Sequence, residues 1–215
     1  MKETSKYIDE IDDILSKEIS ALKQIRKYVD VELDHSIEAI TGCRGKVILM
    51  GIGKSGHIAS KISATFSSLG TPAFFLHPAE ALHGDLGAIE KEDVVIVISH
   101  SGETIEIVKC LEYFIEIGCM IIGIVGNKNS TIAEKCKHVI CVPVSEEACN
   151  LNLAPTSSAM VTLAIGDILA IITSKLKGFT IYDFANRHPS GELLKVAKRR
   201  LLTDHMNDSG NKKQL

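Results

Sequence analysis

Five short apolar runs, rich in valine and isoleucine, constrain the fold of this 215-residue chain more than any other feature. Their hydrophobicity is continuous rather than alternating, which indicates strands that are covered on both faces. Parallel strands joined by helical crossovers have this property. The runs are KVILM (46–50), AFFLH (73–77), VVIVIS (94–99), MIIGIVG (120–126) and HVICVPV (138–144).

The segments around these runs show the spacing of helices. Residues 4–29 carry isoleucine and leucine at steps of three and four, which predicts an amphipathic helix, and a long helix is expected from about Pro155 to Lys177. We therefore expect an α/β fold, a three-layer α/β/α sandwich with a five-stranded parallel, flavodoxin-like sheet in the order 2-1-3-4-5. Residues 1–205 are predicted to form a single domain, and residues 206–215 a disordered tail without apolar periodicity.

Charge and composition indicate which classes of partner and which cellular compartment to expect. A net charge of −3 leaves no basic excess to displace counterions from a polynucleotide, so no nucleic-acid partner is expected. The six cysteines form no CxxC pair and are expected to be free thiols. The acidic N-terminus is unlike a signal peptide, and the apolar segment from Met160 to Thr173 is shorter than the roughly 20 residues that span a bilayer. We therefore expect a cytoplasmic protein without a membrane partner.

A glycine-rich segment follows the first predicted strand. Gly51-Ile52-Gly53-Lys54-Ser55-Gly56 precedes a helix, where glycine lets backbone amides approach an anion. The segment matches the dinucleotide pattern G-x-G-x-x-G. However, the second strand ends in His77-Pro78 instead of a ribose-binding acid, and the spacing does not fit a Walker A loop. We favour a phosphate site, and a glycine-rich turn without a ligand is the alternative.

A second loop of this kind follows the third predicted strand, with the sequence Ser99-His100-Ser101-Gly102-Glu103-Thr104. Its hydroxyl groups and unpaired amides could bind an anion, or one serine could simply cap the next helix. In the predicted strand order, the loops after the first and third strands flank the crevice where the order reverses. The two loops together therefore indicate one phosphate-bearing ligand.

These loops and two later motifs give the chain a family resemblance. Residues 51–87, SHSGET (99–104), EEACNLNLAPTSSAM (146–160) and DFANRHPSGEL (183–193) resemble the SIS (sugar isomerase) family, in particular its D-arabinose 5-phosphate isomerases. The resemblance covers roughly residues 40–205. It implies an enzyme that interconverts D-ribulose 5-phosphate and D-arabinose 5-phosphate through an enediol, with no cofactor and no metal. It also implies a supply of Kdo for lipopolysaccharide or capsule.

The resemblance implies catalytic roles for Lys54, Glu103, Glu147 and His188. Lys54 would supply fixed positive charge, and His188 would open the sugar ring, acting across an oligomer interface. Glu147 is preferred to Glu103 as the base, which would need a pKa raised by burial; Glu103 could instead hold Lys54 by an ion pair. The residues expected to bind the substrate are Gly53, Ser55, His83, Ser99, Ser101, Gly102, Thr104, Thr156, Ser157 and Ser158.

Several alternatives stand beside this interpretation. His83 could brace its loop, and the His83–Asp85 pair could catch a divalent metal, although two ligands fall short of a structural site. His100 stands where relatives usually have asparagine, which leaves the substrate preference open. The chain could act on a hexulose or heptose phosphate, or it could be a noncatalytic sugar-phosphate sensor.

Two expectations concern regulation and assembly. Many relatives carry a CBS domain pair after the isomerase domain, whereas this sequence ends at Leu215, so regulation through those modules is not expected. Direct feedback inhibition by a nucleotide sugar, CMP-Kdo, is the hypothesis that takes its place. The two long apolar helices offer more hydrophobic surface than one sheet face can cover, which predicts a homodimer or homotetramer.

Overall fold

The computed structural model describes the backbone of residues 5–211 and the side chains of residues 5–202. One sheet of parallel strands has the order β2-β1-β3-β4-β5, which confirms the predicted topology. Every residue of β1 and β3 is buried, which explains why these strands are apolar without alternation. The strands are β1 (Val47–Met50), β2 (Ala73–Phe75), β3 (Val94–Ser99), β4 (Met120–Val125) and β5 (His138–Cys141).

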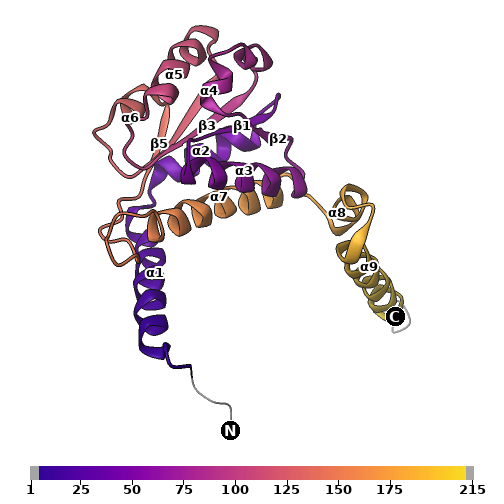
Figure 1. Cartoon of the computed structure of the whole chain (residues 1–215). Helices are drawn as coiled ribbons and strands as arrows, with labels where there is room; N and C mark the ends of the chain where they lie inside the picture. The colour runs from indigo at the N-terminus through magenta and orange to yellow at the C-terminus, as the bar shows by residue number, and fades with distance from the viewer. Residues whose placement is uncertain (1–4, 212–215) are drawn as a thin grey trace.

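Helices cover both faces of the sheet, as Figure 1 shows, and this confirms the three-layer architecture. Leu49 of β1 faces one layer and its neighbour Ile48 faces the other, so each layer has its own apolar core. The Leu49 layer contains α1 (Ile8–Tyr28), α2 (Val31–Thr41), α3 (Lys54–Ser68) and α7 (Ser157–Leu176). The Ile48 layer contains α4 (Pro78–Ala81), α5 (Ile105–Ile117) and α6 (Thr131–Lys135).

Helix α7 is central to its layer, where it contacts α1, α2 and α3. It has 20 residues and is, within the described chain, the one helix long and apolar enough to cross a membrane. The prediction that this apolar segment is too short was therefore wrong. The helix continues past Gly166, where the Ile62 side chain of α3 packs closely, and past Asp167, which forms an ion pair with Lys61. Part of its apolar surface thus serves packing inside this fold.

The two ends of the chain extend from the body in Figure 1. At the N-terminal end, α1 leaves large apolar side chains such as Ile11 and Leu15 exposed. At the C-terminal end, α8 (Ile181–Arg187) starts with a capping box between Thr180 and Asp183 and leads to α9 (Gly191–Asn211). Residues 206–211 are therefore helical in the structure, in contrast to the predicted disordered tail, and residues 212–215 lie outside the described part of the chain.

Candidate functional site

The carboxyl edge of the sheet brings three segments of the chain to one small cavity. Lys54 and Ser55 begin α3 directly after β1, His100 follows β3, and Ser158 lies in the first turn of α7. The cavity has a volume of about 30 Å³, which is room for about one water molecule. Its lining is completed by Ile58, Pro155, Ala159 and Thr162.

The first loop presents a positively charged helix start. Gly53 adopts a left-handed φ of +59° and provides no side chain to cap α3, so the first backbone amides of the helix remain available. A Cβ atom on Gly51 would lie 2.8 Å from the Ser55 carbonyl oxygen, so this turn requires glycine. Lys54 adds its charge to the positive end of the helix dipole. Such a site favours a phosphate group, as predicted for Gly53, Lys54 and Ser55.

The second loop uses its hydroxyl groups to hold its own shape. The Ser99 and Thr104 hydroxyls are hydrogen-bonded at 2.8 Å, and Ser99 Oγ also accepts the Gly102 N–H at 3.1 Å. The exposed Ser101 Oγ accepts the Glu103 N–H at 3.2 Å. Gly102, with φ of +72°, packs against Ser130, where a larger residue would collide. Ser99 and Thr104 therefore shape the loop, while Ser101 lies on its exposed surface beside His100.

Glu103 is bonded to the start of α6. Its carboxylate accepts the backbone N–H of Thr131 at 2.9 Å and the Thr131 hydroxyl at 2.7 Å, at the start of α6. These two bonds lower the pKa of Glu103. Among the described side chains no ion pair joins Glu103 to Lys54, so the structure does not form the contact that the sequence offered as an alternative.

Glu147 instead faces the start of α7. Its carboxylate accepts the backbone N–H groups of Thr156 and Ser158 at 2.8 and 3.1 Å, and it also accepts both of their hydroxyl groups. Burial raises the pKa of Glu147, but the hydrogen bonds from Ser158 and Thr156 outweigh that effect and the pKa is lowered. This differs from the raised pKa expected for the base. The Thr156 and Ser158 hydroxyls, predicted to bind substrate, bind Glu147 here.

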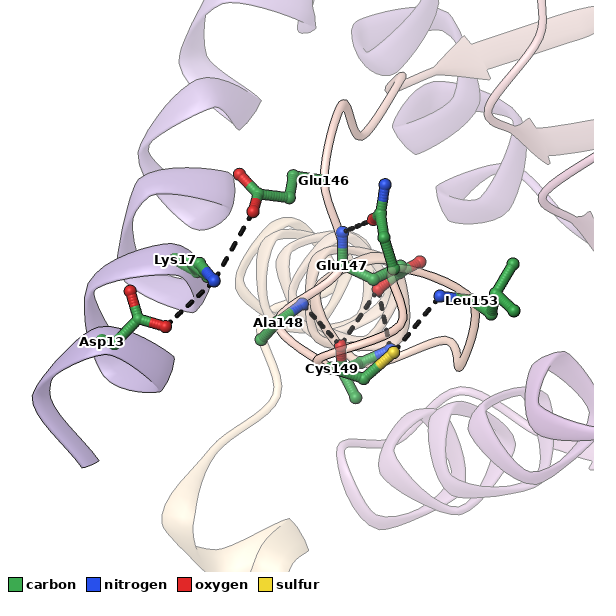
Figure 2. Close-up of polar contacts among 9 residues, drawn as sticks. Asp13, Lys17, Glu146, Glu147, Ala148, Cys149 and Leu153 are labelled. Atoms are coloured by element: carbon green, nitrogen blue, oxygen red, sulfur yellow. Dashed lines mark hydrogen bonds and ion pairs between the residues drawn. The ribbon is translucent and has the colours of Figure 1, made fainter. Parts of the chain in front are cut away.

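The neighbouring carboxylate of Glu146 lies on the other side of the chain (Figure 2). It forms an ion pair with Lys17 of α1 at 3.5 Å, and Lys17 also pairs with Asp13 at 2.9 Å. The two carboxylates therefore bond to different elements, Glu146 to α1 and Glu147 to the start of α7. Glu147, bonded to the cavity residue Ser158, is thus the member of the pair that lies toward the site.

His188 lies at the opposite end of α3 from Lys54. Its Nε2 is 2.9 Å from the Ser68 hydroxyl, its Nδ1 is 2.8 Å from the Phe184 carbonyl oxygen, and its ring stacks on the Phe184 ring. Ser68 ends α3 and Lys54 begins it, so a rise of 1.5 Å per residue separates them by about 21 Å. Within one chain the structure therefore does not bring His188 to the cavity.

Two further predicted residues are not among the cavity-lining side chains of the described chain. His83 is exposed in the segment between α4 and the short 3₁₀ helix Asp85–Ala88, and it is not among the cavity-lining side chains in the described chain. Ser157 is completely buried, and among the described residues its hydroxyl has no hydrogen-bond partner.

The structure also adds two residues that the sequence analysis did not assign to the site. His100 and Thr162 line the cavity. His100 stands in the second loop, so its place after β3 could have identified it. Thr162 follows Ser158 by four residues and donates to the Ser158 carbonyl oxygen, so helical spacing could have identified it as a residue on the same face.

Residues 40–172 match the SIS domain family. The chain belongs to this family. Among curated SIS relatives, arabinose 5-phosphate isomerase KdsD of Yersinia pestis is 46% identical over 180 residues, which is 84% of this chain and 55% of the relative. KdsD of Escherichia coli K12 is 45% identical over 181 residues, with the same coverage of 84% and 55%. This SIS chain thus spans about half the length of the curated relatives that it matches.

Solved structures show the same SIS fold. The structure of E. coli CFT073 c3406 in complex with arabinose 5-phosphate has a TM-score of 0.83 and 41% identity, covering 87% of this chain and all of that one. The Vibrio vulnificus NanR protein complexed with ManNAc-6P has a TM-score of 0.72 at 13% identity, covering 90% of this chain and 69% of that one, so its likeness concerns the fold alone. Lys54, Glu103 and Glu147 lie within the matched SIS region, whereas His188 lies beyond it.

Proposed function

We propose that this SIS protein is an aldose–ketose isomerase that interconverts D-ribulose 5-phosphate and D-arabinose 5-phosphate. The observation that carries the proposal is the meeting of the α3 start, the loop after β3 and the α7 start at one cavity, with Lys54, Ser55, His100 and Ser158 in its lining. The identity to KdsD enzymes and to the structure that holds arabinose 5-phosphate supports this substrate pair.

In this proposal the α3 start holds the phosphate. The free backbone amides after Gly53 and the Ser55 hydroxyl donate to phosphate oxygens, and Ser101 contributes from the second loop. Lys54 supplies positive charge that stabilises the developing enediolate oxygen. The cavity holds little more than one water molecule, so binding a sugar phosphate requires the segment between β5 and α7 to move outward.

The proton transfer is assigned to Glu147. Its carboxylate removes the proton from C2 of the open-chain aldose, which leaves the enediolate. A proton passes from O2 to O1, and the carboxyl group returns its proton to C1, which gives the ketose; the reverse reaction exchanges these steps. The lowered pKa keeps Glu147 ionised near neutral pH and ready to accept a proton. Outward movement of Thr156 and Ser158 would remove hydrogen bonds from the carboxylate and raise its basicity. Glu103 is the second candidate, but its bonds to Thr131 direct it toward α6.

Ring opening by His188 requires a second subunit in this scheme. About 21 Å along α3 separate Lys54 from Ser68, the partner of His188, which supports a role at the cavity of another subunit. The exposed apolar side chains of α1, including Ile8, Ile11 and Leu15, support a homodimer or homotetramer that could bring a partner histidine to the site. Residues 1–205 are proposed to act as one domain in such an assembly.

The biological setting is proposed from the relatives. The similarity to KdsD enzymes supports a place in the supply of Kdo for lipopolysaccharide, with capsule synthesis as the alternative destination. The free state of all six cysteines supports a cytoplasmic location. Feedback inhibition by CMP-Kdo at the same cavity is part of this proposal.

Turnover of purified full-length protein tests the proposed function. We expect D-arabinose 5-phosphate to form from D-ribulose 5-phosphate, and Lys54→Ala to abolish this activity. Lys61→Ala is the matched control because Lys61 lies on the same helix and pairs with Asp167, away from the proposed reaction. Turnover of a hexulose or heptose phosphate instead would identify another isomerase, and binding of a sugar phosphate without turnover of any would identify a sensor.

A further inference from the structure

A group of potential metal ligands lies outside the proposed active site. Glu32 and His35 stand in the first turns of α2, and His138 is the first residue of β5. Each of these side chains offers one ligand atom, and those atoms all lie within 4.8 Å of one another. Glu32 and His138 are 106 positions apart in the sequence, so no local motif reveals the group.

The distances between the donor atoms suit a tetrahedral ion. Glu32 Oε2 lies 3.0 Å from His138 Nδ1, and Glu32 Oε1 lies 3.8 Å from His35 Nδ1. Metal–ligand bonds of about 2.0–2.1 Å at tetrahedral angles place neighbouring donors about 3.3–3.4 Å apart. The Glu32–His138 distance lies slightly below this value, and the three ligand atoms all lie within 4.8 Å of one another, so side-chain shifts of up to about 1.5 Å would complete the geometry.

The surroundings also favour an ion. The Glu32 carboxylate and His138 Nδ1 already lie within hydrogen-bond distance of each other, and a metal ion could take the place of the proton between them. The His138 side chain is 14% exposed and is anchored on the sheet, whereas the His35 side chain is 44% exposed. An ion could therefore enter from solvent on the His35 side and keep a water as its fourth ligand.

We propose that Glu32, His35 and His138 form a binding site for a divalent transition-metal ion, with Zn²⁺ as the best fit. Two imidazoles and one carboxylate are a ligand set that Zn²⁺ uses readily. The bound ion would join α2 to β5, an edge strand of the sheet, and so hold two distant parts of the chain together. This revises the sequence-based expectation of no metal, which weighed only the His83–Asp85 pair.

The proposed metal site is separate from the proposed active site. His138 begins β5, at the amino edge of the parallel sheet, whereas Lys54 and His100 follow the carboxyl ends of β1 and β3. Its role is therefore structural, and it does not depend on the proposed isomerase activity.

Metal binding to tag-free, full-length protein tests this site. After removal of metals by chelation, equilibrium dialysis against Zn²⁺ should show a site whose affinity falls at least about tenfold in both His35→Ala and Glu32→Gln. Co²⁺ bound in the same place should give the intense visible absorption of a four-coordinate ion, and the two variants should lose it. His35→Ala changes a half-exposed side chain and should remain folded, as circular dichroism would verify.

Control variants distinguish this site from adventitious binding. His83→Ala and His57→Ala should retain the Zn²⁺ affinity and the Co²⁺ spectrum of the unchanged protein. Zn²⁺ should also raise the melting temperature of the unchanged protein but not of His35→Ala. Unaltered Zn²⁺ affinity in His35→Ala and Glu32→Gln, loss of the bound ion only in His83→Ala, or no binding by the unchanged protein would each overturn the proposal.

Discussion

Replacing Glu147 by glutamine tests both its proposed role as the base and its structural role at the start of α7. The carboxylate accepts two backbone N–H groups and two hydroxyl groups. An amide keeps one acceptor oxygen and turns an NH₂ group toward these donors, so roughly half of the bonds are lost. We expect the free energy of unfolding to fall by about 2–4 kcal/mol. Loss of the base should lower kcat by about 100- to 10,000-fold.

The assay for this variant should separate chemistry from folding. Incorporation of solvent deuterium at C2 of arabinose 5-phosphate reports proton abstraction directly, and urea denaturation reports stability. Glu146→Gln is the matched control because Glu146 is adjacent but pairs with Lys17; its kcat should stay within about twofold of the unchanged protein. The assignment would be refuted if folded Glu147→Gln protein exchanged deuterium at the unchanged rate while Glu103→Gln protein showed no exchange. The role of the base would then pass to Glu103.

Three further outcomes follow from other contacts. Asp93→Asn should cost roughly 3 kcal/mol of stability in denaturant titrations, because the buried Asp93 carboxylate binds Lys46 at 2.8 Å. Burial raises the pKa of Asp93, but the bonds from Lys46 and Glu90 lower it overall. The contribution of Asp93 to the stability of the fold should therefore be complete above its unfolded pKa and disappear as the pH falls through the lowered folded value. Melting curves between pH 6 and about 2 would show this loss. No acid-dependent difference between Asp93→Asn and the unchanged protein would contradict this. Gly102→Ala should lose about 2–4 kcal/mol in thermal unfolding, because of its positive φ and the contact with Ser130; an unchanged melting temperature would contradict that contact. Ser101→Ala should raise KM for the sugar phosphate by about tenfold with little change in kcat, and an unchanged KM would remove Ser101 from the phosphate site.

The sheet could be predicted because strands that are buried on both faces have continuous apolar sequences. β1 and β3 are buried on both faces, so their runs are apolar throughout, and parallel crossovers restrict the strand order. The same reasoning placed the loops around Ser55 and His100 at one edge. The long helix α7 was predicted as well, but the length of its apolar segment was underestimated, since Gly166 and Asp167 look like interruptions until Ile62 and Lys61 of α3 are seen to contact them.

The site contacts depend on segments that sequence spacing does not bring together. Glu147 meets residues 156 and 158 only because an irregular loop folds back on itself, and Glu103 turns to Thr131, 28 positions away. The role of His188 rests on family resemblance, and its action across an oligomer interface stays a prediction, because the structure of one chain places it near Ser68, at the other end of α3 from Lys54.

A crystal structure of this chain with D-arabinose 5-phosphate bound would show whether the α3 start holds the phosphate and Glu147 faces the sugar. We expect phosphate oxygens within hydrogen-bond distance of the Ser55 hydroxyl and the first backbone amides of α3, with C2 of the sugar beside Glu147. A phosphate bound elsewhere, or a sugar whose C2 lies beyond reach of the Glu147 carboxylate, would contradict it.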